Sequence, residues 1–181
     1  MNDQSWEIAG RTLEYIDDCH LYLVDGVIVP SVTQLISDPN KYKDVPPSVL
    51  EKARLKGVAV HEAIERFVKE GVRDPMIADF PELIEDKGLN PIGAEIPVIL
   101  FRKEEPFAAG RLDLLLAGDD GCVIADVKTT VKLDIPYITL QLNYYRIGFE
   151  QSYGMEITGL AAIHLRESAK YQKINLEDIR L

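Results

Sequence analysis

The sequence predicts a single α/β domain in which a helix, three strands, a second helix and a further strand follow an N-terminal β-hairpin. Two apolar runs, 112–117 and 122–127, flank a Gly/Asp turn and indicate a hairpin. Apolar residues at helical spacing indicate helices over 48–70 and 139–151. With 181 residues, of which 46% are hydrophobic and 28% charged, the chain is large enough to bury a core.

The first 47 residues are expected to form a small hairpin and a short helix. Asp25-Gly26 supplies a turn, Ser31 is the expected N-cap of the helix, and three prolines indicate a loop after it. The predicted elements are strands over 12–16, 20–24 and 27–29, a helix over 32–37 and a loop over 38–47.

A longer helix is predicted over 48–70. Ser48 and Glu51 match the pattern of a capping box, Gly71 is expected to end the helix, and Gly57 is a point where it could bend or split. His61 lies beside an apolar stripe. The stripe comprises Val60, Ile64, Phe67 and Val68, and a basic cluster before it comprises Lys52, Arg54 and Lys56.

The remaining elements complete a core over 48–165, between an N-terminal part over 1–47 and a tail over 166–181. They are an irregular insertion over 71–93 with a short helix at 81–87, strands over 94–101, 107–117, 122–128 and 157–164, and a final edge strand at 171–176.

Composition excludes several classes of protein. No apolar run approaches the roughly 20 residues that span a bilayer, and the N-terminus lacks the pattern of a signal peptide, so we expect a cytoplasmic protein without a membrane partner. Cys19 and Cys122 are far apart, which argues against zinc, an iron–sulfur cluster and a disulfide framework. The net charge of −10 argues mildly against coating nucleic acid by electrostatics alone.

The predicted hairpin at 112–127 carries the strongest functional signal. If Asp119 and Asp120 are the two turn residues, Asp113 and Asp126 face each other across the strands, with Cβ atoms roughly 4.5–5.5 Å apart. Two buried like charges repel, and a divalent cation such as Mg²⁺ between them would remove that cost. Lys128 projects to the same face as Asp126 and could orient or polarise a metal-bound water. The alternative is an exposed hairpin with ordinary surface charges.

The other candidate residues are weaker signals from the residues alone. A single histidine on a helix, such as His61, is more often structural than a ligand. Glu95 could supply a further carboxylate or be a surface acid at the end of a strand. Gln141 and Tyr145, one turn apart on the helix after the hairpin, could reach the site or a DNA phosphate, or form a polar helix face.

Four motifs in order resemble the RecB-type exonuclease branch of the PD-(D/E)XK nuclease superfamily, over about residues 50–165. Asp113 followed by Asp126-Val127-Lys128 resembles the D…D-x-K signature. The other three are Gly57-Val58-Ala59-Val60-His61, similar to G-T-x-x-H, Gly110-Arg111-Leu112-Asp113, similar to G-x-x-D, and Gln141-Leu142-Asn143-Tyr144-Tyr145, similar to Q-x-x-x-Y. Pro30-Ser31-Val32-Thr33 resembles the start of small phage-type members.

The resemblance implies a restriction-endonuclease-like core, a mixed sheet flanked by helices in the order αβββαβ, and a role for each matching residue. Metal ligands would be His61, Asp113, Asp126 and the backbone carbonyl of Val127, and the catalytic set would be Asp113, Asp126, Lys128 and Glu95. Gln141 and Tyr145 would position DNA or the lysine, and the cluster of Lys52, Arg54 and Lys56 could contact the DNA backbone.

The implied activity is hydrolysis of DNA phosphodiester bonds with Mg²⁺ or Mn²⁺, most simply by an exonuclease acting on ends. The alternatives are an endonuclease or nickase of the same fold, an inactive DNA-binding module, or a structural protein whose acidic hairpin binds Ca²⁺. Val58 replaces the usual threonine, and the iron–sulfur cysteines of many relatives are absent. DNA is the implied partner; a homo-oligomer and a recombination or replication protein are further candidates, in the host cytoplasm if a phage encodes the chain.

Overall fold

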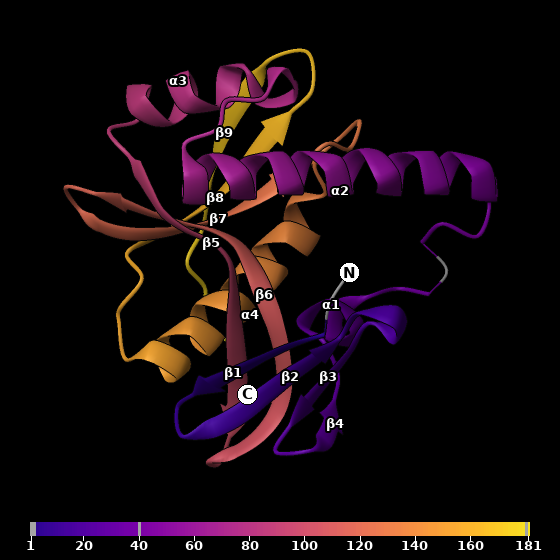
Figure 1. The fold of residues 1–181 in the computed structure, drawn as a ribbon, viewed down its shortest axis with the longest axis vertical. Helices are drawn as coiled ribbons and strands as arrows, with labels where there is room; N and C mark the ends of the chain where they lie inside the picture. Colours follow the sequence, from indigo (N-terminus) through magenta and orange to yellow (C-terminus); the bar gives the residue numbers. More distant parts are fainter. Residues whose placement is uncertain (1–2, 40, 180) are drawn as a thin grey trace.

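The computed structural model describes residues 3–39, 41–179 and 181, and it confirms the α/β class. Within these residues the chain forms a four-stranded antiparallel sheet, a five-stranded mixed sheet and four α-helices (Figure 1). Residues 1–2, 40 and 180, which belong to the predicted N-terminal part, loop and tail, lie outside the described residues. No described helix has the length and hydropathy needed to cross a membrane.

The N-terminal sheet is larger than the predicted hairpin. Its strands are β1 (Gln4–Ile8), β2 (Arg11–Ile16), β3 (Leu21–Val24) and β4 (Val27–Val29), paired in that order. Strand β1 lacks a clear pattern of apolar alternation because its side chains are mostly exposed and polar. The predicted strand over 20–24 begins one residue later, since His20 has a φ of 52° and ends a short 3₁₀ helix at Asp17–Cys19.

The helices follow the prediction except at one cap and at the start of the last helix, which is predicted over 139–151 and begins four residues earlier, after its cap Asp134. Ser31 and Gln34 form a capping box at α1 (Val32–Ile36). The second helix, α2 (Pro47–Glu70), is continuous through Gly57 and ends at Gly71 in the left-handed conformation. The capping box predicted at Ser48 is wrong, because the helix begins one residue earlier at a proline and has no side-chain cap.

The five-stranded sheet contains the predicted order of elements. Its strands are β5 (Asn90–Arg102), β6 (Glu105–Gly118), β7 (Gly121–Lys128), β8 (Gly159–Leu165) and β9 (Ala169–Ile174). Neighbours in sequence are neighbours in the sheet and are antiparallel, except for β7 and β8, which are parallel and joined through α4 (Ile135–Tyr153). The predicted insertion over 71–93 contains a 3₁₀ helix at Pro75–Ile77 and the helix α3 (Asp79–Asp86). Strand β5 starts four residues before the strand predicted at 94.

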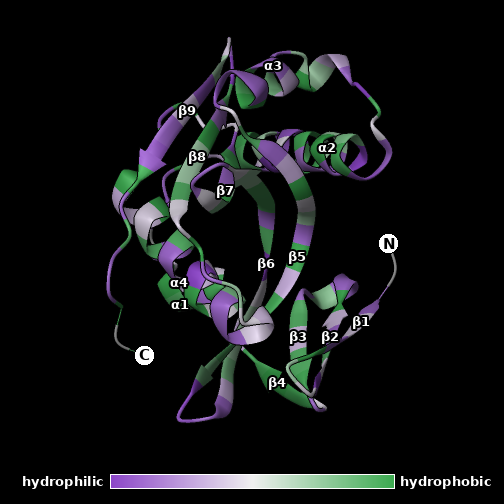
Figure 2. Cartoon of the chain, turned by 90° about the vertical axis from the view of Figure 1, so that its left-hand side faces the viewer, coloured by the Kyte–Doolittle hydropathy of each residue, from purple (hydrophilic) through white to green (hydrophobic). Residues whose placement is uncertain are grey.

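Helices cover both faces of this sheet. The α4 side chains Leu142 and Phe149 belong to one buried cluster, and Ile64 of α2 and Phe80 of α3 belong to another. The long β5–β6 pair continues from these layers to the N-terminal sheet (Figures 1 and 2). There, Ile99 joins a third apolar cluster made mostly of β1–β4 side chains. The N-terminal sheet is thereby packed against the strands that carry Glu95 and Asp113.

Two glycines provide a test of this packing. A Cβ at Gly110 would lie 2.8 Å from Cε1 of the Tyr145 ring, whereas a Cβ at Gly57 would meet nothing within 4 Å. Gly110→Ala should therefore lower the free energy of unfolding by about 1–3 kcal/mol, the usual cost of overpacking. Gly57→Ala should raise it by about 1 kcal/mol, because alanine is the better helix former. Urea denaturation measures both, and equal effects of the two substitutions would contradict this account.

Candidate active site

The predicted register of the β6–β7 hairpin is correct. Gly118 pairs with Gly121 around the two-residue turn, and the ladder continues to Leu114 opposite Ala125. The next positions along the strands are Asp113 and Asp126, where backbone pairing gives way to a side-chain contact: the Val127 amide donates a hydrogen bond of 2.7 Å to Asp113 Oδ2. The two acids thus lie where the paired strands separate.

Asp126 is a buried carboxylate in which one oxygen has a hydrogen-bond partner and the other has none among the described residues. Its exposed fraction is 2%, and its Oδ1 is 2.7 Å from Lys128 Nζ. Its Oδ2 is buried and has no hydrogen-bond partner among the described residues. Gln141 of α4 lies on the other side of the lysine, with Oε1 3.4 Å from Nζ. Lys128 is therefore held between a strand and a helix, close to the acid predicted to bind metal.

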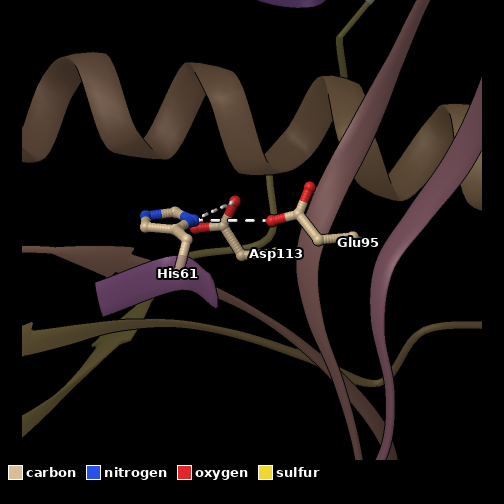
Figure 3. A group of neighbouring side chains, drawn as sticks. All are labelled: His61, Glu95 and Asp113. Carbon is tan, nitrogen blue, oxygen red and sulfur yellow. Dashed lines mark ion pairs between the residues drawn. The ribbon is translucent and has the colours of Figure 1, made fainter. Parts of the chain in front are cut away.

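His61 of α2 faces two carboxylates from neighbouring strands (Figure 3). Its Nδ1 is 3.5 Å from Glu95 Oε1 and 3.7 Å from Asp113 Oδ1. Its Nε2 is 3.2 Å from the carbonyl oxygen of Val127, which can only accept, so the imidazole donates there. The helix thus brings the histidine into contact with β5, β6 and β7 together.

Glu95 occupies an unusual backbone conformation for a strand residue, with a φ of 52°. Side chains also change face at this point: Ala94 belongs to the cluster under α2 and α3, whereas Ile96 packs against the cluster under α4. On β6, Leu114 and Leu112 change face in the same way. A left-handed residue costs roughly 1–2 kcal/mol in a non-glycine position. Here it directs the Glu95 carboxylate toward the histidine.

The charges of the site shift the pKa values of its members. The Asp113 carboxylate raises the pKa of His61 to about 9, against the effect of burial, and Glu95 adds to the rise. Burial raises the pKa of Asp126 to about 6, although Lys128 opposes this. Burial alone would lower the pKa of Lys128, but Asp126 and Asp113 outweigh it and raise that pKa, so the lysine is an ammonium at neutral pH.

These groups fit a divalent cation. One ligand atom each from His61, Glu95 and Asp113 lies within 4.8 Å of the others. Asp126, a predicted ligand, is not part of this group, but its buried Oδ2, unpartnered among the described residues, is an acceptor that a cation would satisfy. With Nε2 donating to the Val127 oxygen, Nδ1 is the His61 nitrogen that faces the two carboxylates.

A cavity of about 280 Å³ opens beside the acids. Tyr145, predicted to position DNA or the lysine, contributes to its wall and is nearly buried; burial first, and then Asp113, raise its pKa well above the ordinary value. The N-terminal sheet and α1 supply much of the remaining wall. Their contributions are Tyr15, His20, Tyr22, Ser31 and Thr33.

The predicted basic cluster is not brought together. Arg54 forms a double contact of 2.8 Å with Glu51 and lines a second cavity that also reaches His61. Lys52 and Lys56 lie two residues before and after Arg54, which places them about 200° away around the helix axis. Both lysines are exposed. Their predicted role at the DNA backbone would therefore concern DNA outside the cavity.

Arg111 is the main residue of the site that sequence reasoning did not assign. Its guanidinium is 4.6 Å from the Tyr15 ring, 3.6 Å from Glu95 Oε2 and 3.0 Å from Gln4 Oε1. It thus joins the N-terminal sheet to the acids. Its position two residues before Asp113 on one strand face is a signal that alternation could have provided. The tyrosines of the N-terminal sheet offered no such signal.

Comparison with known proteins gives little further information. No family model matches the chain, and no curated protein matches it. Among solved structures, the fold is similar to the crystal structure of SSO0001, with a TM-score of 0.48 and 14% sequence identity over 83% of this chain and 68% of that chain.

Metal binding should be visible as thermal stabilisation. A ligand at one hundred times its Kd adds about 2.7 kcal/mol to the free energy of unfolding, or roughly 5–11 °C in Tm for a chain of this size. We expect Mn²⁺ or Mg²⁺ to raise Tm in this range. Asp113→Asn should lose most of the shift while keeping the fold, because the amide oxygen can still accept from Val127.

The matched control is Asp119→Asn, which removes an exposed acid from the turn of the same hairpin. It should keep the full metal-induced shift in Tm, measured by differential scanning calorimetry. Equal shifts in the two variants would mean that the metal does not bind at Asp113.

Proposed function

We propose that this protein is a metal-dependent deoxyribonuclease. The observation that supports this most is the grouping of Asp113, Asp126 and the Lys128 ammonium, of which Asp113 lines an open cavity. His61 reaches the same group from α2. A structural Ca²⁺ site would need the carboxylates but gives no reason to bury a lysine and a histidine among them.

The ligand set is proposed to be His61, Asp113, Asp126 and the Val127 carbonyl, with Glu95 as an additional acid. When bound, a divalent ion would supply a water of lowered pKa and offset charge on the phosphate. Carboxylate and carbonyl oxygens suit both Mg²⁺ and Mn²⁺, whereas imidazole favours transition metals. The histidine in the set therefore favours tighter binding of Mn²⁺.

The charge of Lys128 defines its proposed role. As an ammonium it has no lone pair and cannot accept a proton, so it would not act as the general base. It can donate hydrogen bonds to the attacking water or to a phosphate oxygen as negative charge develops there. Asp126 and Gln141 fix its position for this task. Glu95, which Arg111 contacts in turn, would orient His61.

The proposed fold is a restriction-endonuclease-like core. It is supported by the succession of α2, three antiparallel strands, α4 and a parallel strand. Within this fold, action on DNA ends is the preferred activity because His61 and the Gln141/Tyr145 pair belong to motifs that resemble exonucleases. An endonuclease of the same fold is the second candidate, since the cavity is open to solvent beside the acids.

Removal of Lys128 should separate chemistry from metal binding. Lys128→Ala should reduce DNA cleavage at least a hundredfold, the usual loss when one transition-state hydrogen-bond donor is removed. The Tm shift with Mn²⁺ should persist, because the proposed ligands remain. Lys132→Ala, an exposed lysine four residues later, is the control and should keep its activity. Cleavage by Lys128→Ala at the wild-type rate would remove the lysine from the proposed mechanism.

The kind of nuclease is tested with DNA that has ends and DNA that has none. Linear DNA labelled at either end and closed circular DNA of the same sequence are incubated with Mn²⁺, with Mg²⁺ and with chelator. Degradation of the linear DNA alone, only with metal, is the expected result. Cutting of the circles would favour the endonuclease. DNA binding without cleavage under any metal would favour an inactive binding module.

A further inference from the structure

A second group of side chains leads away from the catalytic centre along the start of α4. Lys41 lies between α1 and α2, and its Nζ is 2.6 Å from Asp134 Oδ2. The same ammonium is 4.4 Å from the centroid of the Tyr137 ring and 5.7 Å from that of Tyr42. Asp134 also caps α4 by accepting a hydrogen bond from the Tyr137 amide. This segment is therefore attached to the first turn of the helix.

Tyr137 connects this group to the catalytic centre. It lies one turn before Gln141, whose amide oxygen contacts Lys128. Burial raises the pKa of Tyr137, and the charges of Lys128 and Lys41 both oppose the rise. The Lys41 ammonium contacts the ring directly, and Lys128 is reached through Gln141, one turn along the helix. Cations and aromatic rings thus alternate from Lys128 through Tyr137 and Lys41 to Tyr42. We call these four residues the cation–aromatic row.

The outer end of the row is exposed and lies in a basic part of an acidic protein. Tyr42 exposes 52% of its surface, and Lys43 beside it is also exposed. Residues 41–58 contain five Lys or Arg and two Asp or Glu, so this stretch carries +3 in a chain of net charge −10. Figure 1 shows that the first half of α2 reaches beyond the central sheet. This surface is complementary in charge to a polyanion.

We propose that the cation–aromatic row binds an unpaired stretch of the DNA strand being cut, an inference that rests on the proposed function. An unpaired base can stack on the exposed Tyr42 ring, and the phosphates beside it can approach Lys41 and Lys43. Bases inside a duplex are stacked on one another and cannot reach a ring. The row therefore selects single-stranded DNA, or the frayed strand at a duplex end, and leads it toward Lys128.

The test measures binding without cleavage, in chelator, by fluorescence anisotropy of a labelled 15-nucleotide strand and of the matching duplex. Tyr42→Ala should weaken binding of the single strand about five- to a hundredfold, the range for loss of one stacking contact. Duplex binding should change little, and Tyr42→Trp should retain binding of the single strand. Tyr171→Ala is the matched control, because the Tyr171 ring also has a lysine near it, at 5.9 Å, but lies on β9.

Three outcomes would contradict the proposed role of the row. The wild-type protein could bind the duplex more tightly than the single strand. Tyr42→Ala could leave single-strand affinity unchanged, or it could weaken binding of both DNA forms equally. Failure of the proposed function would look different, because cleavage is assayed separately with metal. If Tyr42→Ala selectively loses single-strand binding and the wild-type protein cleaves no DNA with any metal, the result supports DNA binding by the row and contradicts the proposed nuclease activity.

Discussion

The buried Asp126 carboxylate is the constraint on which the rest of the site depends. A charge in that position costs several kcal/mol unless partners offset it. Lys128 offsets it on one oxygen, and the other oxygen has no partner among the described residues. Lys128 is itself largely covered and needs both Asp126 and Gln141. The placement of α4 against β7 is thus tied to the charge of one strand residue.

The site lies where the regular sheet is interrupted. Ladder pairing between β6 and β7 stops one position before the two acids. On the other edge of β6, Glu95 has a left-handed backbone conformation, and the side chains before and after it pack on opposite faces of the sheet. A regular sheet would direct alternate side chains to opposite faces and bury them under the helices. The interruption leaves room for His61 to reach carboxylates from two strands. Strain of this kind is common where a protein assembles a functional site.

The sequence predicted local features well and tertiary ones poorly. The turn at Asp119 and Asp120, the capping by Ser31 and the end of α2 at Gly71 are each determined by a few neighbouring residues, and all three agree with the structure. The left-handed conformation of Glu95 could not be predicted, because nothing in its neighbours requires it. Strand β1 was missed since its exposed side chains carry no apolar alternation, and its pairing with β2 supplies the stability.

The same distinction applies to the candidate site. Asp113, Asp126 and Lys128 could be placed relative to one another because a two-residue turn fixes register. The role of Arg111 depends on Tyr15 and Gln4, which come from a sheet whose docking the sequence does not encode locally. The three basic residues on α2 are close in sequence, yet helical geometry places Arg54 about 200° around the axis from both Lys52 and Lys56.

The charges of the site suggest why substrate and metal would bind together. Glu95, Asp113 and Asp126 supply three negative charges. Lys128, Arg111 and the protonated His61, whose pKa is about 9, supply three positive ones, so the metal-free site is close to neutral at pH 7. A divalent ion that displaces the His61 proton would leave a net charge of +1. A neutral site gives a phosphate diester little reason to enter, whereas a positive one attracts it. Binding of DNA at the proposed site would thereby depend on metal, while the exposed Tyr42 and Lys43 at the outer end of the cation–aromatic row would hold the strand in either state.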